Sequence, residues 1–273
     1  MKTTYLPDLS HLAPTPTWLP HDLPDRLEPD WLQARYDEIL AACDAAADDA
    51  AAWLEVVRRT SELETFISSS AGRVRIAYRQ DTQDEAVTAE YERLNREINP
   101  VVSDSSVEVA RRIVASPCTD AIAAEFGEVL LQLMEAACRA HAPVNTKLRT
   151  ELSDVLMKHT RIFGTGTIQW RGETHPFSFA RKAAYDTDRD ERHAAWQSKI
   201  DYVRENEGAL QGIFDEARGL REQMAKNLDQ PSFVELRYLE MHRFDWNADD
   251  AARVRAAIER HVVPVASQLQ LRQ

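Results

Sequence analysis

Apolar residues three and four positions apart run through most of the chain from Asp30 onward, which is the period of an α-helix. Two early sets form continuous helix faces: Leu32, Tyr36, Leu40 and Cys43, then Trp53, Val56, Thr60, Leu63 and Ile67. The Ala- and Asp-rich stretch 41–52 between them indicates a helix–turn–helix corner. A third set follows at Tyr91, Leu94 and Ile98, and Asn99-Pro100 is expected to interrupt it.

The pattern continues through the middle of the chain. One helix is expected to carry Val102, Val109 and Ile113 and to stop at Ser116-Pro117. Thr119 is predicted to cap a single long helix. The inward positions of that helix are Ile122, Phe126, Val129, Leu130 and Leu133. A further helix is expected from about 145 to 158, with one face formed by Leu148, Leu152, Val155 and Leu156.

The one β signal lies between these helices and the next. Residues 167–175 read Thr-Ile-Gln-Trp-Arg-Gly-Glu-Thr-His, in which β-branched and aromatic residues flank a possible turn at Arg171-Gly172. We predict a short hairpin near 162–176. A lone hairpin is marginally stable in water, so it needs a helix beside it.

Helical periodicity then returns and persists to the last residue. Thr187 and Asp190 resemble a helix start, and that helix should run towards Asn206. A second carries Leu210, Ile213, Phe214, Ala217, Leu220, Met224 and Leu228, and Ser232 to Glu235 is a capping-box pattern. The last helix should start near Asn247 and kink at Pro264. Its expected inward positions are Val254, Ile258, Val262, Val265 and Leu269.

The two ends of the chain differ. Six prolines within residues 1–29 predict an extended arm, which Trp18, Leu19, Leu23 and Leu27 are expected to hold against a surface. The C-terminal residues stay in helical rhythm with no Gly, Asn or Pro to close the helix. We therefore expect the sequence to end inside an element.

Composition narrows the class of protein. The chain has 273 residues, 44% hydrophobic and 29% charged, with only 8 Gly, which suits a folded helical protein. A net charge of −12 opposes binding to nucleic acid and to anionic membrane surfaces. The N-terminus lacks a signal-peptide pattern, and no apolar run reaches 18 residues. The scattered Cys43, Cys118 and Cys138 favour a reducing cytoplasm.

A search for catalytic chemistry finds no candidate site. None of the eight histidines precedes Glu, and no two lie four positions apart, so there is no His-Glu-x-x-His motif. His159, Glu173 and His175 group around the hairpin, but a third strong ligand is missing and surface polar residues are the simpler interpretation. Gly164-Thr165-Gly166 is too short to hold a pyrophosphate. We assign no catalytic, cofactor-binding or metal-binding residue.

A resemblance appears in the second half of the chain. The segments that carry it are Ala180–Trp196, Asn227–Leu236, Arg237–Trp246, Val262–Val265 and Leu269–Gln273. In order and spacing they resemble the oligoendopeptidase F branch of the thimet oligopeptidase-like zinc peptidases. That family shows a hairpin, a helix opening with Asp-Arg, a Leu-Gly-Tyr segment, a Phe-x-Glu-Leu helix, an Arg-x-Asp-aromatic turn and a Val-Pro helix. Leu228-Asp229-Gln230 departs from Leu-Gly-Tyr, which should affect only a local turn.

The resemblance implies an all-α helical array with one short hairpin, forming the N-terminal half of a bowl-shaped peptidase. It implies an arm at 1–29, a helical domain at 30–160 and an incomplete peptidase domain at 161–273. In the complete enzyme zinc would be held by His-Glu-x-x-His and a downstream Glu, none of which this sequence contains. Short peptides and the missing C-terminal half are the implied partners, and this chain alone is expected to be inactive and to bind no zinc.

Two alternatives stay open at this point. The chain could be a stand-alone, non-catalytic helical module that binds peptides or proteins. It could also be a helical interaction domain with only chance similarity to the peptidases.

Overall fold

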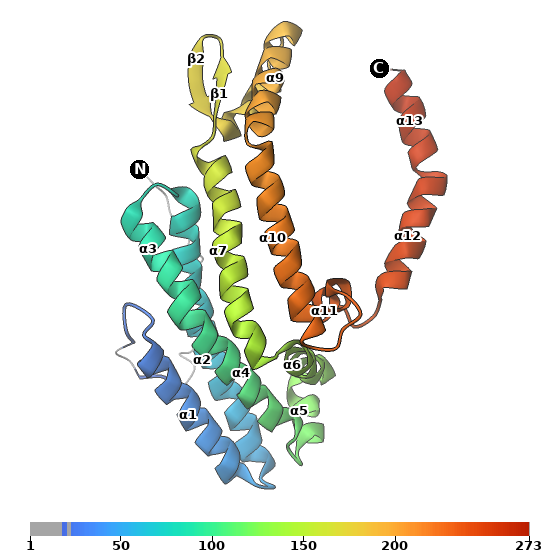
Figure 1. Cartoon of the computed structure of the whole chain (residues 1–273). Helices are drawn as coiled ribbons and strands as arrows, with labels where there is room; N and C mark the ends of the chain where they lie inside the picture. Colours follow the sequence, from blue (N-terminus) through green and yellow to red (C-terminus); the bar gives the residue numbers. More distant parts are fainter. Residues whose placement is uncertain (1–17, 21–22, 273) are drawn as a thin grey trace, which may run out of the picture.

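The computed structural model describes residues 18–20 and 23–272 and is built almost entirely of helices (Figure 1). The predicted all-α class with one short hairpin is confirmed. The elements in chain order are α1 (Pro29–Ala46), α2 (Ala50–Gln80), α3 (Glu85–Arg93), the π-helix η1 (Leu94–Ile98), α4 (Asn99–Val114), α5 (Thr119–Phe126), α6 (Glu128–Ala140), α7 (Pro143–Thr165), β1 (Thr167–Trp170), β2 (Glu173–Pro176), the 3-10 helix η2 (Phe177–Phe179), α8 (Ala180–Ala183), α9 (Arg189–Glu205), α10 (Glu207–Lys226), α11 (Phe233–Glu240), α12 (Ala248–His261) and α13 (Val263–Leu271).

The first core forms among the N-terminal helices. The predicted inward faces of α1 and α2 are confirmed: Leu32, Tyr36 and Leu63 are fully buried, and Val56 is nearly so. Asp49 caps α2 by accepting bonds from the backbone amides of Ala51 and Ala52, so the predicted corner at 41–52 is also confirmed. Each such large side chain contributes on the order of 1.5–3 kcal/mol when it leaves water, which makes this cluster the main source of stability in the N-terminal region.

The N-terminal arm is held where the structure describes it. The backbone amides of Trp18 and Leu19 donate to the Glu62 carboxylate on α2, at 2.9 and 3.2 Å. Leu19 and Leu27 are buried in the first core, whereas Leu23 is 38% exposed. The remainder of the predicted arm, residues 1–17 with Pro7, Pro14 and Pro16, lies outside the described residues.

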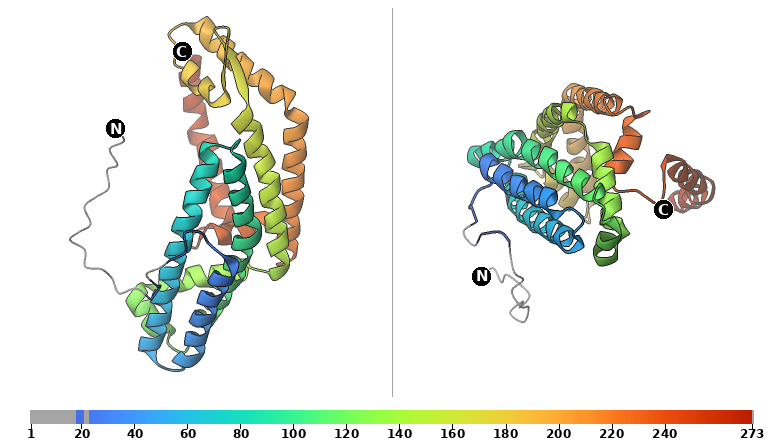
Figure 2. Two further views of the ribbon diagram at one scale, coloured as in Figure 1. Left: turned by 90° about the vertical axis from the view of Figure 1, so that its left-hand side faces the viewer. Right: turned by 90° about the horizontal axis from the view of Figure 1, so that it is seen from below.

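A long helix pair, α7 and α10, runs from the first core towards the hairpin (Figures 1 and 2). Val155 on α7 packs against Ile213 and Ala217 on α10, as the apolar periodicity predicts. At the lower end the fully buried Asn145 amide donates to the carbonyl oxygen of Met224 at 3.0 Å and accepts from the side chain of Asn227 at 2.8 Å. A buried amide with both groups satisfied fixes the register of the two helices.

The predicted hairpin is confirmed, with its strands at Thr167–Trp170 and Glu173–Pro176, whereas residues 162–165 of the predicted range belong to the end of α7. β1 and β2 pair antiparallel from Thr167 with Pro176 to Trp170 with Glu173, so Arg171 and Gly172 form the turn, both with positive φ. The chain reaches the hairpin through Gly166, which packs directly against the Tyr202 ring of α9. A Cβ at Gly166 would lie 2.8 Å from that ring, so only glycine fits between α7 and β1.

Two interruptions differ from the sequence prediction. The single long helix expected after Thr119 is wrong, because Gly127 adopts φ +89° and divides it into α5 and α6. Val129, expected to face inward, is 59% exposed. The expected break at Asn99-Pro100 is also wrong: the π-helix η1 leads directly into α4, and Pro100 stands in the first turn of α4, where its missing N–H costs no hydrogen bond.

The last two helices form what we call the C-terminal arm, residues 248–271, which stands apart from the rest of the chain in Figure 1 and in the right-hand view of Figure 2. Every residue from 252 to 272 is exposed. The inward burial predicted for the five apolar positions of this segment is therefore wrong: Val254, Ile258, Val262, Val265 and Leu269 are 47–59% exposed. Their period does form a helix, and the predicted start at Asn247 and bend before Pro264 are confirmed.

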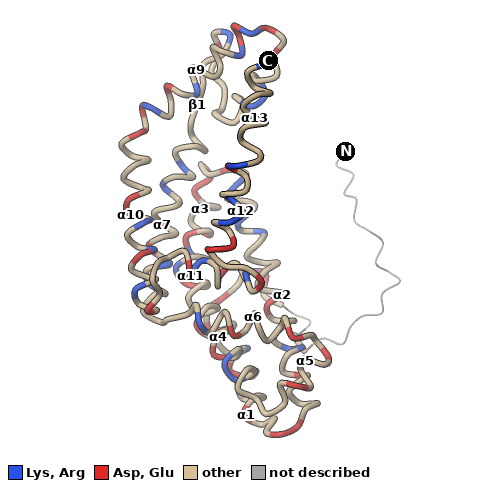
Figure 3. The backbone as a smooth tube through the Cα atoms, turned by 90° about the vertical axis from the view of Figure 1, so that its right-hand side faces the viewer, with Lys and Arg blue, Asp and Glu red and all other residues tan. Residues whose placement is uncertain are grey.

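Charged residues of both signs alternate along the helices rather than gathering on one face (Figure 3). Many pair within one turn, as Arg59 does with Glu55 and Arg112 with Glu108. Within the described part of the chain, none of the helices combines the length and apolar character that crossing a membrane requires.

Polar groups meet where α4, α6, α7 and α11 converge. His141, at the end of α6, lies with its Nε2 3.3 Å from Asp104 on α4, and Arg149 on α7 pairs with Glu240 on α11 at 2.6 Å. Burial lowers the pKa of His141 below its ordinary value of 6.5, with Arg111 and Arg149 acting in the same direction and Asp104 opposing them.

The close approach at Gly166 gives a first prediction. Gly166→Ala forces the Tyr202 ring to move and should lower the free energy of unfolding by about 1–3 kcal/mol. Gly212→Ala is the matched control: Gly212 lies inside α10 with open space around it, so alanine should stabilise by about 0.5–1 kcal/mol. Urea unfolding measures both, and a neutral Gly166→Ala variant would contradict the steric argument.

The buried histidine predicts a pH dependence. Because the folded-state pKa of His141 is depressed, the folded chain binds this proton less readily than the unfolded chain. The associated stability is present above about pH 6.5 and is lost as the pH falls below it. The urea midpoint should therefore drop between pH 7.5 and 5.5, and His141→Gln should reduce that drop. His261→Gln, on the exposed arm, should leave the drop in the urea midpoint unchanged. If both variants show the same drop, His141 is not the source of the pH dependence.

Candidate functional site

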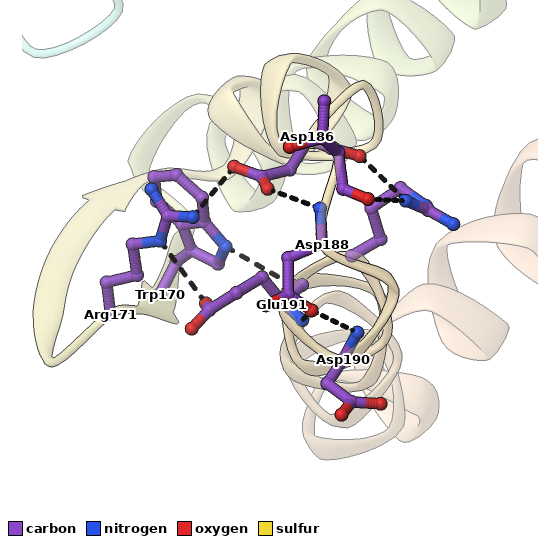
Figure 4. A network of polar contacts seen from close by, with 8 residues as sticks. Trp170, Arg171, Asp186, Asp188, Asp190 and Glu191 are labelled. Carbon is purple, nitrogen blue, oxygen red and sulfur yellow. Dashed lines mark hydrogen bonds and ion pairs between the residues drawn. The ribbon is translucent and has the colours of Figure 1, made fainter.

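The densest polar network near the hairpin joins its turn to the start of α9 (Figure 4). The Arg171 guanidinium lies 2.9 Å from the Asp186 carboxylate and 3.5 Å from that of Glu191. The indole Nε1 of Trp170 donates to the backbone carbonyl of Glu191 at 3.3 Å. These contacts attach the β1 end of the hairpin turn to α9 and to the segment just before it.

The segment before α9 explains why these groups meet. Asp188, rather than the predicted Thr187, is the N-cap of α9 and accepts from the amides of Asp190 and Glu191. Asp186 accepts from the amide of Asp188 at 2.9 Å, and its carbonyl accepts from Arg192 at 2.7 Å. These bonds fix the turn that presents the Asp186 carboxylate to Arg171, while carboxylates near the positive end of α9 are favoured there.

Aromatic side chains fill the space between the hairpin and its neighbours. Arg171 lies over the Trp170 ring at 4.3 Å, and Trp170 contacts Phe179 with ring centroids 5.5 Å apart. Below them Phe177 packs against Tyr202, whose hydroxyl donates to the carbonyl of Ile162 at 2.6 Å. The arrangement gives a small two-stranded element the support that it lacks alone.

The histidines considered from the sequence lie in separate surroundings. His159 on α7 packs on Phe163, whereas His175 on β2 stacks on Phe179 at 4.0 Å, with Glu173 3.7 Å from its Nε2. Within residues 18–20 and 23–272, no three His, Cys, Asp or Glu side chains come together as a metal site requires. The network at the hairpin can position a surface element, and it presents no nucleophile next to a base.

One residue of the predicted family pattern has a local structural consequence. Asp229, in the Leu-Asp-Gln sequence that departs from Leu-Gly-Tyr, has φ +53° in the turn after α10. That conformation favours glycine, and Asp is among the few other residues that tolerate it. The departure thus changes a turn residue and leaves the turn in place.

Comparison with known proteins places these features in a class. The Peptidase M3 N-terminal domain model matches residues 25–141, which cover α1 to α6. No curated protein matches the chain. The fold and the family model together define a chain that resembles the N-terminal part of M3-type peptidases.

Solved structures narrow the resemblance to one branch. A structure provisionally named oligoendopeptidase F is 27% identical, with a TM-score of 0.87 over 93% of this chain. PZ peptidase A, solved with an inhibitor, is 26% identical, and a provisionally named oligoendopeptidase F from Bacillus anthracis str. Ames is 25% identical, each with a TM-score of 0.86 over 91% of this chain. The chain therefore resembles the N-terminal part of oligoendopeptidase F-like peptidases, and a chance similarity is excluded.

The three solved structures belong to chains much longer than this one. This chain spans 44–45% of the length of these three structures. Their remaining parts have no counterpart in the 273 residues.

The hairpin attachment is testable through Arg171. Arg171→Lys loses the planar group that pairs with two carboxylates and stacks on Trp170, so the unfolding free energy should fall by about 1 kcal/mol. Amide exchange in residues 167–176 should become faster. Arg218→Lys, which keeps a single surface pair with Glu222, is the control and should change stability by less than about 0.5 kcal/mol. Equal effects of the two variants would show that the network does not hold the hairpin.

Proposed function

We propose that this chain is the N-terminal portion of a zinc-dependent oligoendopeptidase that hydrolyses short peptides, and that this portion alone is inactive. The observation that carries the proposal is the match over 93% of this chain, with a TM-score of 0.87, to a chain more than twice as long. The peptidase family model over residues 25–141 supports the same class independently of the solved structures.

Zinc is the metal that this class implies, and the described residues do not fit it. A catalytic zinc site takes three protein ligands, usually His with a carboxylate, close enough to share one ion. The described side chains form no such group. We therefore assign zinc binding and the general base to polypeptide beyond these residues, and derive no chemical step on this chain.

The contribution of this chain is then structural. In our proposal the α7–α10 pair forms one wall of a channel that admits short, unfolded peptides, and the hairpin lies along that wall. The support is the rigid attachment of the hairpin through Arg171, Asp186 and Glu191. We place the complete enzyme in the cytoplasm, in keeping with three free cysteines.

The proposal predicts how the purified chain behaves. It should carry well under one zinc per chain by elemental analysis, and a quenched-fluorescence oligopeptide should stay uncleaved with or without added zinc. Stoichiometric zinc together with cleavage that a chelator abolishes would contradict the assignment, because the reactive centre would then lie within these 273 residues.

A further inference from the structure

The C-terminal arm carries an apolar stripe that nothing in the described chain covers. The stripe consists of Val254, Ile258, Val262, Val265 and Leu269, spaced four, four, three and four residues apart. Of the 19 large hydrophobic residues that are exposed within residues 18–20 and 23–272, 10 fall in residues 241–271. Scattered exposed apolar residues are ordinary, whereas a contiguous concentration of them marks an interaction surface.

The helical structure of the arm is supported by local caps and charges, although no other described element packs on it. Asn247 and Asp250 form a reciprocal capping box at the start of α12, and Arg260 and His261 occupy its last turn, where positive charge is favoured. Helices of 14 and 9 residues are nonetheless marginal in water without tertiary packing. Two helices that are marginal alone and carry an apolar stripe need a packing partner to be stable.

The junction with the body fixes the direction of the arm. The Arg243 guanidinium lies 4.7 Å from the ring of Tyr238 on α11 and 4.1 Å from the ring of Trp246 just before α12, and these two rings contact each other with centroids 5.5 Å apart. The amide of Arg243 also donates to the carbonyl of Tyr238 at 3.1 Å. The mutual contacts of one guanidinium and two rings hold the turn, so the stripe is presented in a defined orientation.

At least part of the arm falls within the match to a longer protein. The 7% of this chain outside the match to the 27%-identical structure is about 19 residues, fewer than the 14 and 9 residues of α12 and α13 together. Part of the arm thus superposes on a chain of which this sequence covers only 44%.

Resting on the proposed function, we infer that the stripe is the docking surface for an apolar helical face of the C-terminal peptidase portion. The stripe extends about 22 Å along the arm at 1.5 Å per residue, which matches a partner helix of about four turns. α13 carries no charged residue from Val263 to Leu271, so a partner face without charges suits it. A second copy of this chain is the less favourable occupant, because each copy carries a net charge of −12 and the two repel.

Limited trypsin digestion tests the docking, because Arg253, Arg255 and Arg260 lie on the exposed arm. The full 273-residue chain should be cut rapidly at these sites and should be monomeric by light scattering. A chimera joining the full chain to the remaining portion of the 27%-identical enzyme should be cut there at least tenfold more slowly. An arm already protected in a dimer of the isolated chain would overturn the inference, and so would a chimera with no protection.

Paired variants assign the protection to the stripe. Ile258→Asp with Leu269→Asp should restore rapid cutting in the chimera, whereas Ile76→Asp with Val129→Asp, equally exposed on the body, should not. The stripe variant should leave the unfolding midpoint of the isolated chain unchanged, which shows that it still folds. Equal behaviour of the two variants in the chimera would overturn the inference.

Zinc content and peptide cleavage by the chimera separate this inference from the proposed function. If the arm is protected in a chimera that neither binds zinc nor cleaves peptides, the docking inference is supported and the proposed function is contradicted. If the chimera cleaves peptides while trypsin still digests the arm rapidly, the proposed function is supported and the docking inference is contradicted.

Discussion

The packing of α7 against α10 is the constraint on which the rest of the structure depends. α7 leaves the polar junction beside the N-terminal core and ends at the hairpin, so its position sets that of every later element. Asn145 fixes its lower end to α10 through two satisfied hydrogen bonds, and Val155 packs against Ile213 and Ala217 in the middle. At the upper end Gly166 allows α9 to approach, and Tyr202 bonds to the last turns of α7.

The upper end of this helix pair leads to an element that other parts of the chain hold in place, and the lower end leads to an arm that no described element covers. At the upper end the hairpin is small, but the Arg171 ion pairs with Asp186 and Glu191 and the Trp170 indole bond to Glu191 attach it to the start of α9. At the lower end α11 and the Arg243 turn lead into an arm that no described element covers. The hairpin end is held by contacts within the described chain, and the arm presents an apolar surface that no described element covers.

Most of the helices can be predicted from the sequence, because the apolar period is accompanied by capping residues at helix starts and by residues that end helices. The faces of α1 and α2, the hairpin turn at Arg171-Gly172 and the start at Asn247 were all predictable from local residues. Gly127 was not recognised as a break, because a lone glycine in an apolar rhythm also occurs inside helices. Pro100 was read as a stop, although a proline in the first turn of a helix loses no bond.

Burial on the C-terminal arm could not be predicted, since periodicity specifies a face and does not specify what covers it. The hairpin network is a further case: Arg171, Asp186 and Glu191 are brought together only by the fold, so the spacing of residues along the chain gives no signal for it. The sequence of the gene on the 3′ side of codon 273 tests the central claim most directly. If this chain is the front of an oligoendopeptidase, that stretch encodes His-Glu-x-x-His followed by a further Glu. A stop codon with no such motif in any nearby frame would contradict it.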